Sequence, residues 1–146
     1  MSAPVVILLD TNVVSELMRP GPDANVLAWF DRRPAATLHF SAVGEAELRT
    51  GVAILPAGKR RDRLLAAIDA MIAEDFAGRV LPFCSASAKA FAQIAAARRE
   101  QGRPISQADG QIAAIARAAG AAVATRNTGD FDGCGVDLVD PWRPTA

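Results

Sequence analysis

Five short apolar runs alternate along this chain with longer stretches whose apolar residues recur at helical spacing. This alternation is typical of βαβ units, in which parallel strands form a central sheet and the connecting helices cover it. We therefore expect an α/β fold with a parallel sheet. The expected strands are residues 5–9, 37–42, 79–83, 121–125 and 136–139.

Helical periodicity accounts for the longer stretches. It predicts one helix around residues 64–72, a second around residues 91–95, and a third around residues 112–119 that ends at Gly120. We interpret the basic tract ARRE at residues 97–100 as a solvated helix end, with contact to a phosphate backbone as the alternative. No linker, repeat or low-complexity segment interrupts the 146 residues, so we expect a single domain over residues 1–146.

Charge and cysteine content exclude several classes of protein. Sixteen basic residues balance sixteen acidic ones, so the chain lacks the overall positive charge of many nucleic-acid binders, although a local site remains open. Cys84 and Cys134 lie far apart without CxxC spacing, which argues against a disulfide framework or a zinc site. The first apolar run is too short for a signal peptide, and no stretch approaches the ~18 apolar residues of a membrane helix. We expect a cytoplasmic protein without a membrane segment.

Oxygen-bearing side chains follow the expected strands at the point where each strand ends. Asp10 comes directly after the first apolar run, and Ser41 lies near the end of the second strand. The segment after the fourth strand contains Asn127 and Asp130. In an open parallel sheet, ligands bind in the crevice beyond the carboxyl ends of the strands. The sequence therefore predicts a polar site at this edge of the sheet.

Two of the expected helices each add a carboxylate. Glu47 shares a helix face with Val43 and Ile54, at spacings of four and seven, so we expect it to point inward, where an unpaired charge is costly. Asp109 lies three residues before Ile112 on the apolar stripe of its own helix. Both acids are thus expected to lie at the inner side of a helix rather than in solvent.

Each of these acids also has a purely structural interpretation. The interpretations are a helix N-cap for Asp10, Thr11 or Asn12, a capping box for Ser106 with Asp109, and a buried ion pair for Glu47. A chance convergence of Asp10, Glu47 and Asp109 on one crevice is much less expected than any single one of these structural interpretations. We therefore take the three together as candidate catalytic residues.

Carboxylates within a few ångströms of one another do not all stay ionised unaided. A divalent cation resolves the conflict, and oxygen ligands without His or Cys favour Mg²⁺ or Mn²⁺ over zinc. Water acidified by such a metal attacks a phosphodiester. The single histidine, His39, falls in the second strand, which excludes a two-histidine ribonuclease and argues against a Ser-His-Asp triad. Neither GxxxxGK[ST] nor GxGxxG occurs, which argues against a nucleotide pocket of those types.

Six motifs in order resemble the PIN domain, specifically the VapC/FitB branch of bacterial toxin–antitoxin ribonucleases. They are LLDTNVVSEL, SAVGEAELRTG, AGRVLPF, ADGQIAAIA, VATRNTGDF and VDPW, and they span nearly the whole chain. LDTN alone would be weak, but six motifs at the family's spacing are specific.

The resemblance implies a three-layer α/β/α sandwich with a central parallel sheet. It assigns the metal-binding acids to Asp10 and Asp109 and the helix-borne catalytic acid to Glu47, with Thr11, Asn12 and Thr125 lining the site or bracing the strand-end turn. It further implies Mg²⁺-dependent endoribonuclease cleavage of RNA, silenced by a VapB-like antitoxin whose C-terminal segment lies across the groove. Toxins of this family usually form homodimers and larger toxin–antitoxin assemblies.

One position departs from the family pattern. Many members place a fourth aspartate just after the fourth strand, where this chain has Asn127. An amide adds no charge for a second metal, so we favour one metal held by Asp10 and Asp109, with Asp130 as a substitute acid if its loop turns back.

Two alternative functions follow from the residues. A PIN-like module that binds its antitoxin or nucleic acid without turnover is consistent with Asn127 and the neutral overall charge. Phosphoryl transfer by a strand-end aspartate, as in receiver or haloacid-dehalogenase-like folds, is less favoured because DTN lacks the second aspartate of a DxD motif.

Overall fold

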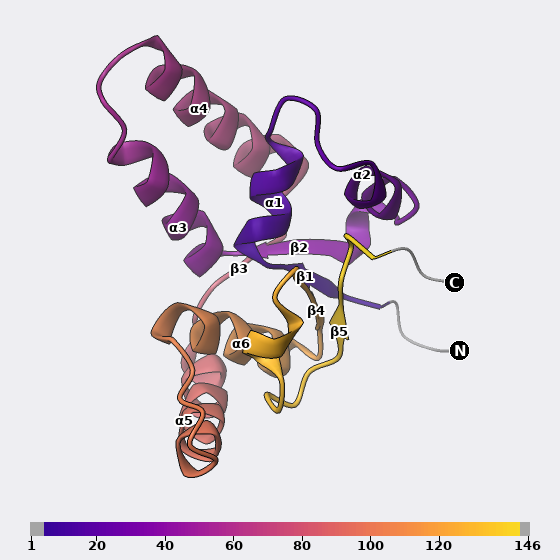
Figure 1. The fold of residues 1–146 in the computed structure, drawn as a ribbon, viewed down its shortest axis with the longest axis vertical. Helices are drawn as coiled ribbons and strands as arrows, with labels where there is room; N and C mark the ends of the chain where they lie inside the picture. The colour runs from indigo at the N-terminus through magenta and orange to yellow at the C-terminus, as the bar shows by residue number, and fades with distance from the viewer. Residues whose placement is uncertain (1–4, 144–146) are drawn as a thin grey trace.

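The computed structural model describes residues 5–143, which form a central sheet with helices on both faces (Figure 1). The strands are β1 (Ile7–Leu9), β2 (Leu38–Ser41), β3 (Val80–Leu81), β4 (Ala122–Ala124) and β5 (Leu138–Val139). The α-helices are α1 (Thr11–Leu17), α2 (Ala24–Asp31), α3 (Ala42–Ala53), α4 (Lys59–Ala70), α5 (Ser85–Glu100) and α6 (Gln107–Ala119). Short helical turns occupy η1 (Ala35–Thr37), η2 (Met71–Asp75) and η3 (Thr128–Phe131).

The sheet is parallel throughout, with the strand order β3-β2-β1-β4-β5. Each of the five expected strands is present, although each is shorter than its apolar run. β1 is the middle strand, and Leu8 pairs with His39 of β2 on one side and with Val123 of β4 on the other. The neighbours β2 and β4 thus lie on opposite sides of β1. At such a point in the strand order, a parallel sheet opens a crevice at its carboxyl edge.

Two apolar clusters separate the layers. Side chains alternate along a strand, so Leu8 packs toward one face of the sheet while Ile7 and Leu9 pack toward the other. Helices α5 and α6 cover the first face through Ile94 and Ile112, and α1 and α2 cover the second. This arrangement confirms the three-layer α/β/α sandwich. In Figure 1, α3 and α4 form a helical pair that projects away from the sheet.

Helix ends follow the sequence closely at α6. Gly120 adopts φ 65° and ends the helix, and the N–H of Ala121 donates to the carbonyl of Ala116 at 2.8 Å. Glycine adopts this left-handed conformation at a lower energetic cost than any other residue. Between residues 5 and 143, no helix has both the length and the apolar character needed to cross a membrane.

Candidate active site

β1 delivers Asp10 to the carboxyl edge of the sheet. The side chain is 7% exposed, and it caps α1 by accepting the N–H of Thr11 at 2.8 Å. The backbone N–H of Asp10 still belongs to the sheet, because it donates to the carbonyl of Ala124 at 2.9 Å. The N-cap interpretation is therefore confirmed for Asp10, and it holds the carboxylate at the carboxyl edge of the sheet.

Thr125 is the centre of a hydrogen-bond network beside Asp10. It follows β4, it is fully buried, and its hydroxyl donates to Oδ2 of Asp10 at 2.8 Å. Oγ1 of Thr125 in turn accepts hydrogen bonds from Nδ2 of Asn12 at 3.4 Å and from the backbone N–H of Asn127 at 3.1 Å. Asn12 and Thr125 thus brace the strand-end turns around the acid.

Burial raises the pKa of Asp10 from 3.8 to about 6. The hydrogen bonds from Thr125 and Thr11 oppose this effect, while the negative charges of Asp109 and Glu47 add to it. A buried carboxylate facing two further acids favours either a proton or a cation. The electrostatics therefore make this position receptive to a positive ion.

Glu47 lies on α3, and the structure corrects the expected direction of its side chain. The inner side of α3 runs through buried Gly44 and Val52 and half-buried Leu48, whereas Glu47 is exposed and Ile54 is 79% exposed. The prediction of an inward face was wrong because α3 contacts α4 and α1 more than it contacts the sheet, so the apolar Ile54 does not mark the core side.

Glu47 nevertheless faces the crevice. Oγ1 of Thr11 donates to Oε1 of Glu47 at 2.6 Å, while the backbone N–H of Thr11 donates to Asp10. One threonine therefore links the buried acid to the exposed one. Glu47 is solvent-accessible and held in place, which suits a group that exchanges protons with water.

Asp109 enters the site from the first turn of α6. Ser106 is the N-cap, and its hydroxyl accepts the N–H of Asp109 at 3.2 Å, so half of the expected capping box is present. The side chain is half-buried, and burial raises its pKa, as do the charges of Asp130 and Glu47. Asp109 is thus electrostatically coupled to Asp10, Glu47 and Asp130.

Asn127 and Asp130, the two residues proposed for a fourth acidic or polar position of the site, differ in their placement in the loop after β4. Asn127 is exposed, its backbone N–H donates to Oγ1 of Thr125 at 3.1 Å, and its backbone carbonyl accepts the N–H of Asp130 at 3.0 Å. Asp130 lies in η3, and its carboxylate is near enough to Asp109 to raise the pKa of that residue. Asp130 is therefore electrostatically coupled to the site.

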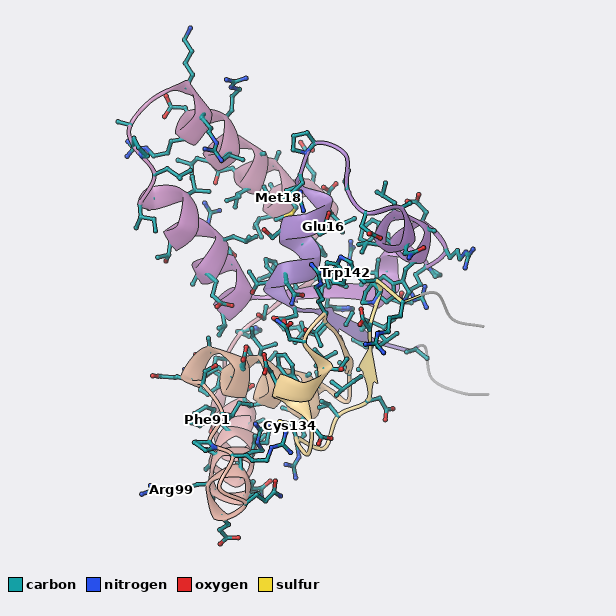
Figure 2. All side chains as sticks on the ribbon, viewed as in Figure 1. Glu16, Met18, Phe91, Arg99, Cys134 and Trp142 are labelled. Carbon is teal, nitrogen blue, oxygen red and sulfur yellow. The ribbon has the colours of Figure 1, made fainter. Side chains whose placement is uncertain are left out.

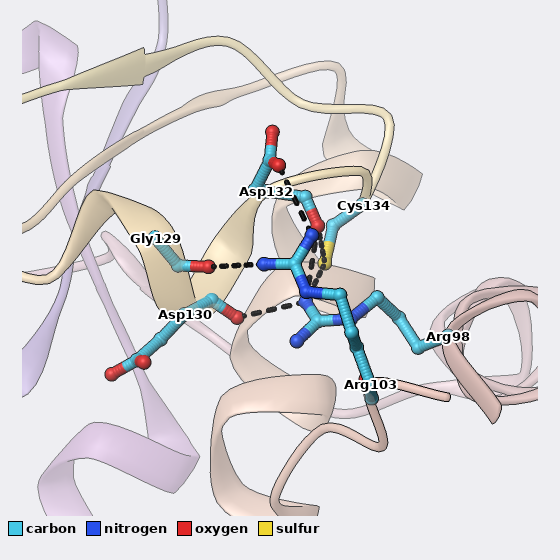
Figure 3. A network of polar contacts seen from close by, with 6 residues as sticks. All are labelled: Arg98, Arg103, Gly129, Asp130, Asp132 and Cys134. Carbon is cyan, nitrogen blue, oxygen red and sulfur yellow. Dashed lines mark hydrogen bonds and ion pairs between the residues drawn. The ribbon is translucent and has the colours of Figure 1, made fainter. Parts of the chain in front are cut away.

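A buried arginine that the sequence did not reveal holds this loop. Arg98 of α5 is 5% exposed, its Nε donates to the carbonyl of Arg103 at 2.7 Å, and its Nη1 donates to the carbonyls of Asp130 and Asp132 at 3.0 Å each (Figure 3). The interpretation of 97–100 as a solvated helix end is wrong for Arg98, although it is right for the exposed Arg99. Helical spacing offered a signal, since Arg98 follows the buried Ile94 by four residues.

The donor chemistry of the site fits a hard divalent cation. Asp10 and Asp109 offer carboxyl groups with raised pKa values. The hydrogen bonds that link Asp10 to Glu47 and Asn12 run through the hydroxyl and amide groups of Thr11 and Thr125, without a histidine or a thiol. Within residues 5–143, no three His, Cys, Asp or Glu side chains are grouped closely enough to form a ready metal cage. Mg²⁺ commonly uses one or two carboxylates and keeps its other ligands as water, so a pair of aspartates is sufficient.

A groove of about 750 Å³ opens beside Thr11 and Glu47, between α1, α3 and α4. Its apolar part includes Leu48, Val52 and Leu64, and Arg19, Arg60 and Arg63 also line it. The acid site is thus continuous with a large groove of mixed apolar and basic character.

The fold and the strand-end acids are those of an α/β nuclease-like domain. Similarity to known proteins identifies the family. The PIN domain model matches residues 7–133, and the chain belongs to the PIN domain family. It is 46% identical to "VapC ribonuclease Y4jK" of Sinorhizobium fredii over 138 residues, covering 94% of this chain and 99% of that protein. It is 44% identical to "Toxin FitB" of Neisseria gonorrhoeae over 137 residues, covering 94% and 99% respectively.

Solved structures agree with the sequence relatives. The crystal structure of FitAcB from Neisseria gonorrhoeae matches with a TM-score of 0.89 and 43% identity, covering 95% of this chain and 100% of that one. A structure of FitAB bound to a DNA fragment matches with a TM-score of 0.90 and 42% identity, covering 97% and 99%. The resemblance to the VapC/FitB branch is confirmed, and the relatives favour a ribonuclease toxin over a binding module without turnover.

Proposed function

We propose that this chain is the toxin of a type II toxin–antitoxin system and an endoribonuclease that hydrolyses RNA phosphodiester bonds with Mg²⁺, or Mn²⁺, at Asp10 and Asp109. The observation that carries the proposal is the Thr11 bridge, which joins buried Asp10 to exposed Glu47 at the strand-end crevice. It stands in a chain 46% identical to a VapC ribonuclease over nearly its full length.

The residues divide the work by their burial. Asp10 and Asp109 are buried or half-buried with raised pKa values, so they would hold the cation. When held there, Mg²⁺ would supply an acidified water and stabilisation of the extra negative charge at phosphorus. Glu47 is exposed, and its position suits acceptance of a proton from the attacking water.

Neighbouring side chains orient these groups. Thr11 and Thr125 donate to Glu47 and Asp10, and Asn12 supports Thr125. Asp130 would add negative charge at the edge of the site through its coupling to Asp109, and Asn127 would contribute at most a neutral ligand. A single cation held by Asp10 and Asp109 is the arrangement that these residues support best.

The partners proposed for the chain are a VapB-like antitoxin and a second copy of itself, within a larger toxin–antitoxin assembly in the cytoplasm. The solved relatives include a FitAB complex with DNA. The groove beside Thr11 and Glu47 offers an antitoxin segment apolar contacts next to the acids. Occupation of this groove would obstruct RNA and so silence the enzyme.

Cleavage of a labelled single-stranded RNA by the purified protein tests the activity. We expect cleavage with Mg²⁺ or Mn²⁺, none with EDTA, and loss of cleavage in Asp109→Asn with an unchanged circular dichroism spectrum. Asp137→Asn, which changes an exposed aspartate just before β5, serves as the matched control and should cleave normally. Metal-dependent cleavage undiminished in Asp109→Asn would refute the site assignment.

Growth tests address the toxin assignment separately. Expression of the chain alone should arrest growth, and co-expression of the reading frame immediately upstream should relieve the arrest through a small co-purifying protein. Arrest that persists in Asp109→Asn would show that toxicity does not depend on cleavage.

A further inference from the structure

A basic and aromatic surface begins one residue from the acid site. Arg126 follows Thr125 directly, its backbone N–H donates to Oδ1 of Asn12 at 3.5 Å, and its guanidinium lies over the ring of Trp142 at 5.3 Å. Trp142 follows β5 and packs on the face of the sheet that carries α1 and α2 (Figure 2). The surface therefore starts at the crevice and leads toward α2.

On α2 the surface continues as a hollow of about 400 Å³. The Nδ2 of Asn25 donates to the backbone carbonyl of Trp142 at 3.0 Å, which joins the hollow to the segment that carries this tryptophan. Arg32, Arg33 and Arg143 line it, and its lining contains no acidic residue. We call Arg32, Arg33, Arg126, Trp142 and Arg143 the Arg–Trp face.

Positive charge on this face is only partly compensated. Arg143 pairs with Asp140 at 3.5 Å, but in the described part of the chain Arg32, Arg33 and Arg126 have no ion pair. Asp31, the acid next to Arg32 in the chain, lines a separate groove with Leu27 and Phe30. A chain with zero net charge thus concentrates arginines on this face, and Arg126 is the member next to Thr125 and Asn12 of the acid site.

Aromatic rings hold two of these arginines in fixed positions. Arg33 lies over the ring of Trp29 at 4.1 Å and donates to the carbonyl of Trp29 at 2.7 Å, and Arg126 lies over Trp142. Stacking on a ring orients a guanidinium while leaving N–H groups available for phosphate oxygens. Arginine planes and partly exposed aromatic rings are also the groups on which unpaired RNA bases stack.

We propose that the Arg–Trp face binds single-stranded RNA on one side of the scissile phosphate, which it positions at Asp10, Glu47 and Asp109. This inference rests on the proposed ribonuclease function and adds the path of the substrate. The arginines contact phosphates, and Trp142 with Arg126 offers a stacking platform next to the crevice. The face contributes to binding of the RNA rather than to the chemical step.

Binding measured without turnover tests the proposal. Fluorescence anisotropy of a labelled single-stranded RNA of about 15 nucleotides, in EDTA, gives the affinity at several salt concentrations. The variant is Arg32→Gln/Arg126→Gln/Arg143→Gln, whose three residues are all exposed. The matched control is Lys89→Gln/Arg99→Gln/Arg117→Gln, three exposed residues of α5 and α6, with Arg99 near the far end of α5 (Figure 2).

We expect the first variant to bind RNA at least about tenfold more weakly at low salt, with a log–log salt dependence shallower by about 2, because each lost phosphate contact on a single strand lowers the slope by about 0.7. Under cleavage conditions its KM should rise with little change in kcat. The control should bind like the unaltered protein. Equal losses in both triple variants, or unchanged binding in the first, would overturn the proposal.

Two further outcomes separate this inference from the proposed function. If the protein binds RNA through the Arg–Trp face but cleaves it with no divalent cation, the proposed ribonuclease activity is refuted and the RNA-binding role of the face is supported. Normal RNA binding by the first variant, together with failure to bind the co-expressed antitoxin, would assign the face to a protein partner and overturn the inference while leaving the enzyme intact.

Discussion

The hydroxyl of Thr125 donates to Oδ2 of Asp10 at 2.8 Å, across 115 positions of the chain. The contact exists because β1 and β4 are neighbours in the sheet and end at the same edge. Within residues 5–143, this hydroxyl and the N–H of Thr11 are the two hydrogen-bond donors to the buried carboxylate. The site therefore depends on strand pairing as much as on its acids.

Thr125→Val should weaken both the fold and the site. Removal of the hydroxyl deprives Asp10 of a donor that lowers its pKa, so that pKa rises further. We expect a loss of about 1–3 kcal/mol in the free energy of unfolding, measured with urea, and weaker Mg²⁺ binding by calorimetry. Thr125→Ser keeps the hydroxyl and should lie close to the unaltered protein. An equal loss in both variants would mean that the methyl group, not the hydrogen bond, matters.

Asp10 should make the metal-free protein more stable at acid pH. Its pKa rises from 3.8 to about 6 on folding, so between these values the folded state holds a proton that the unfolded chain has released. This contribution is complete below about pH 4 and is lost as the pH rises past about 6, by up to about 3 kcal/mol. Urea unfolding in EDTA from pH 4 to 7, compared with Asp10→Asn, measures it. A variant whose pH profile matches that of the unaltered protein would contradict the assignment.

Glu47→Gln should reduce activity without affecting stability. The side chain is exposed and linked to Thr11 by one hydrogen bond, so we expect a change within about 0.5 kcal/mol in unfolding. If Glu47 transfers a proton, kcat should fall by about 10²–10⁴ while RNA affinity in EDTA stays the same. Glu45→Gln on the same helix, where Glu45 pairs with Arg49 at 2.8 Å, is the control and should retain activity.

Arg98→Gln should destabilise the loop that carries Asp130. The buried guanidinium donates to three backbone carbonyls, those of Arg103, Asp130 and Asp132, and its loss leaves them without that donor. We expect about 2–4 kcal/mol of lost stability by urea unfolding. Arg103→Gln, which removes an exposed ion pair to Asp132 at 3.3 Å, should cost less than about 1 kcal/mol. Comparable losses in the two variants would contradict the role given to Arg98.

Two glycines of α3 should respond to alanine in opposite directions. A Cβ at Gly44 would lie 2.5 Å from Cε1 of the Phe40 ring, so Gly44→Ala should cost about 1–3 kcal/mol. A Cβ at Gly51 meets nothing within 4 Å, so Gly51→Ala should stabilise the helix by about 0.5–1 kcal/mol. Thermal unfolding of both variants checks the contrast. Stabilisation by both would show that Phe40 yields without strain.

The sequence alone determined the layers and the residues at the strand ends. Short apolar runs alternating with helical periodicity identify βαβ units, and an acid directly after such a run lies at the carboxyl edge whatever the strand order. The positions of Asp10 and Asp109 were therefore predictable, because each is fixed by the local element that carries it, a strand end for Asp10 and the first turn of a helix for Asp109.

Only the tertiary structure decided which side chains meet. Periodicity placed Glu47 on an inner face, but α3 packs through Gly44 and Val52 and leaves Glu47 exposed beside Thr11. Arg98 looked like a solvated helix end, although it is buried against a loop more than 30 residues further along the chain. The physical reason is the same in both cases. Local spacing fixes the direction in which a side chain projects from its own helix. Its burial and its partners depend on which distant segment packs against that side of the helix.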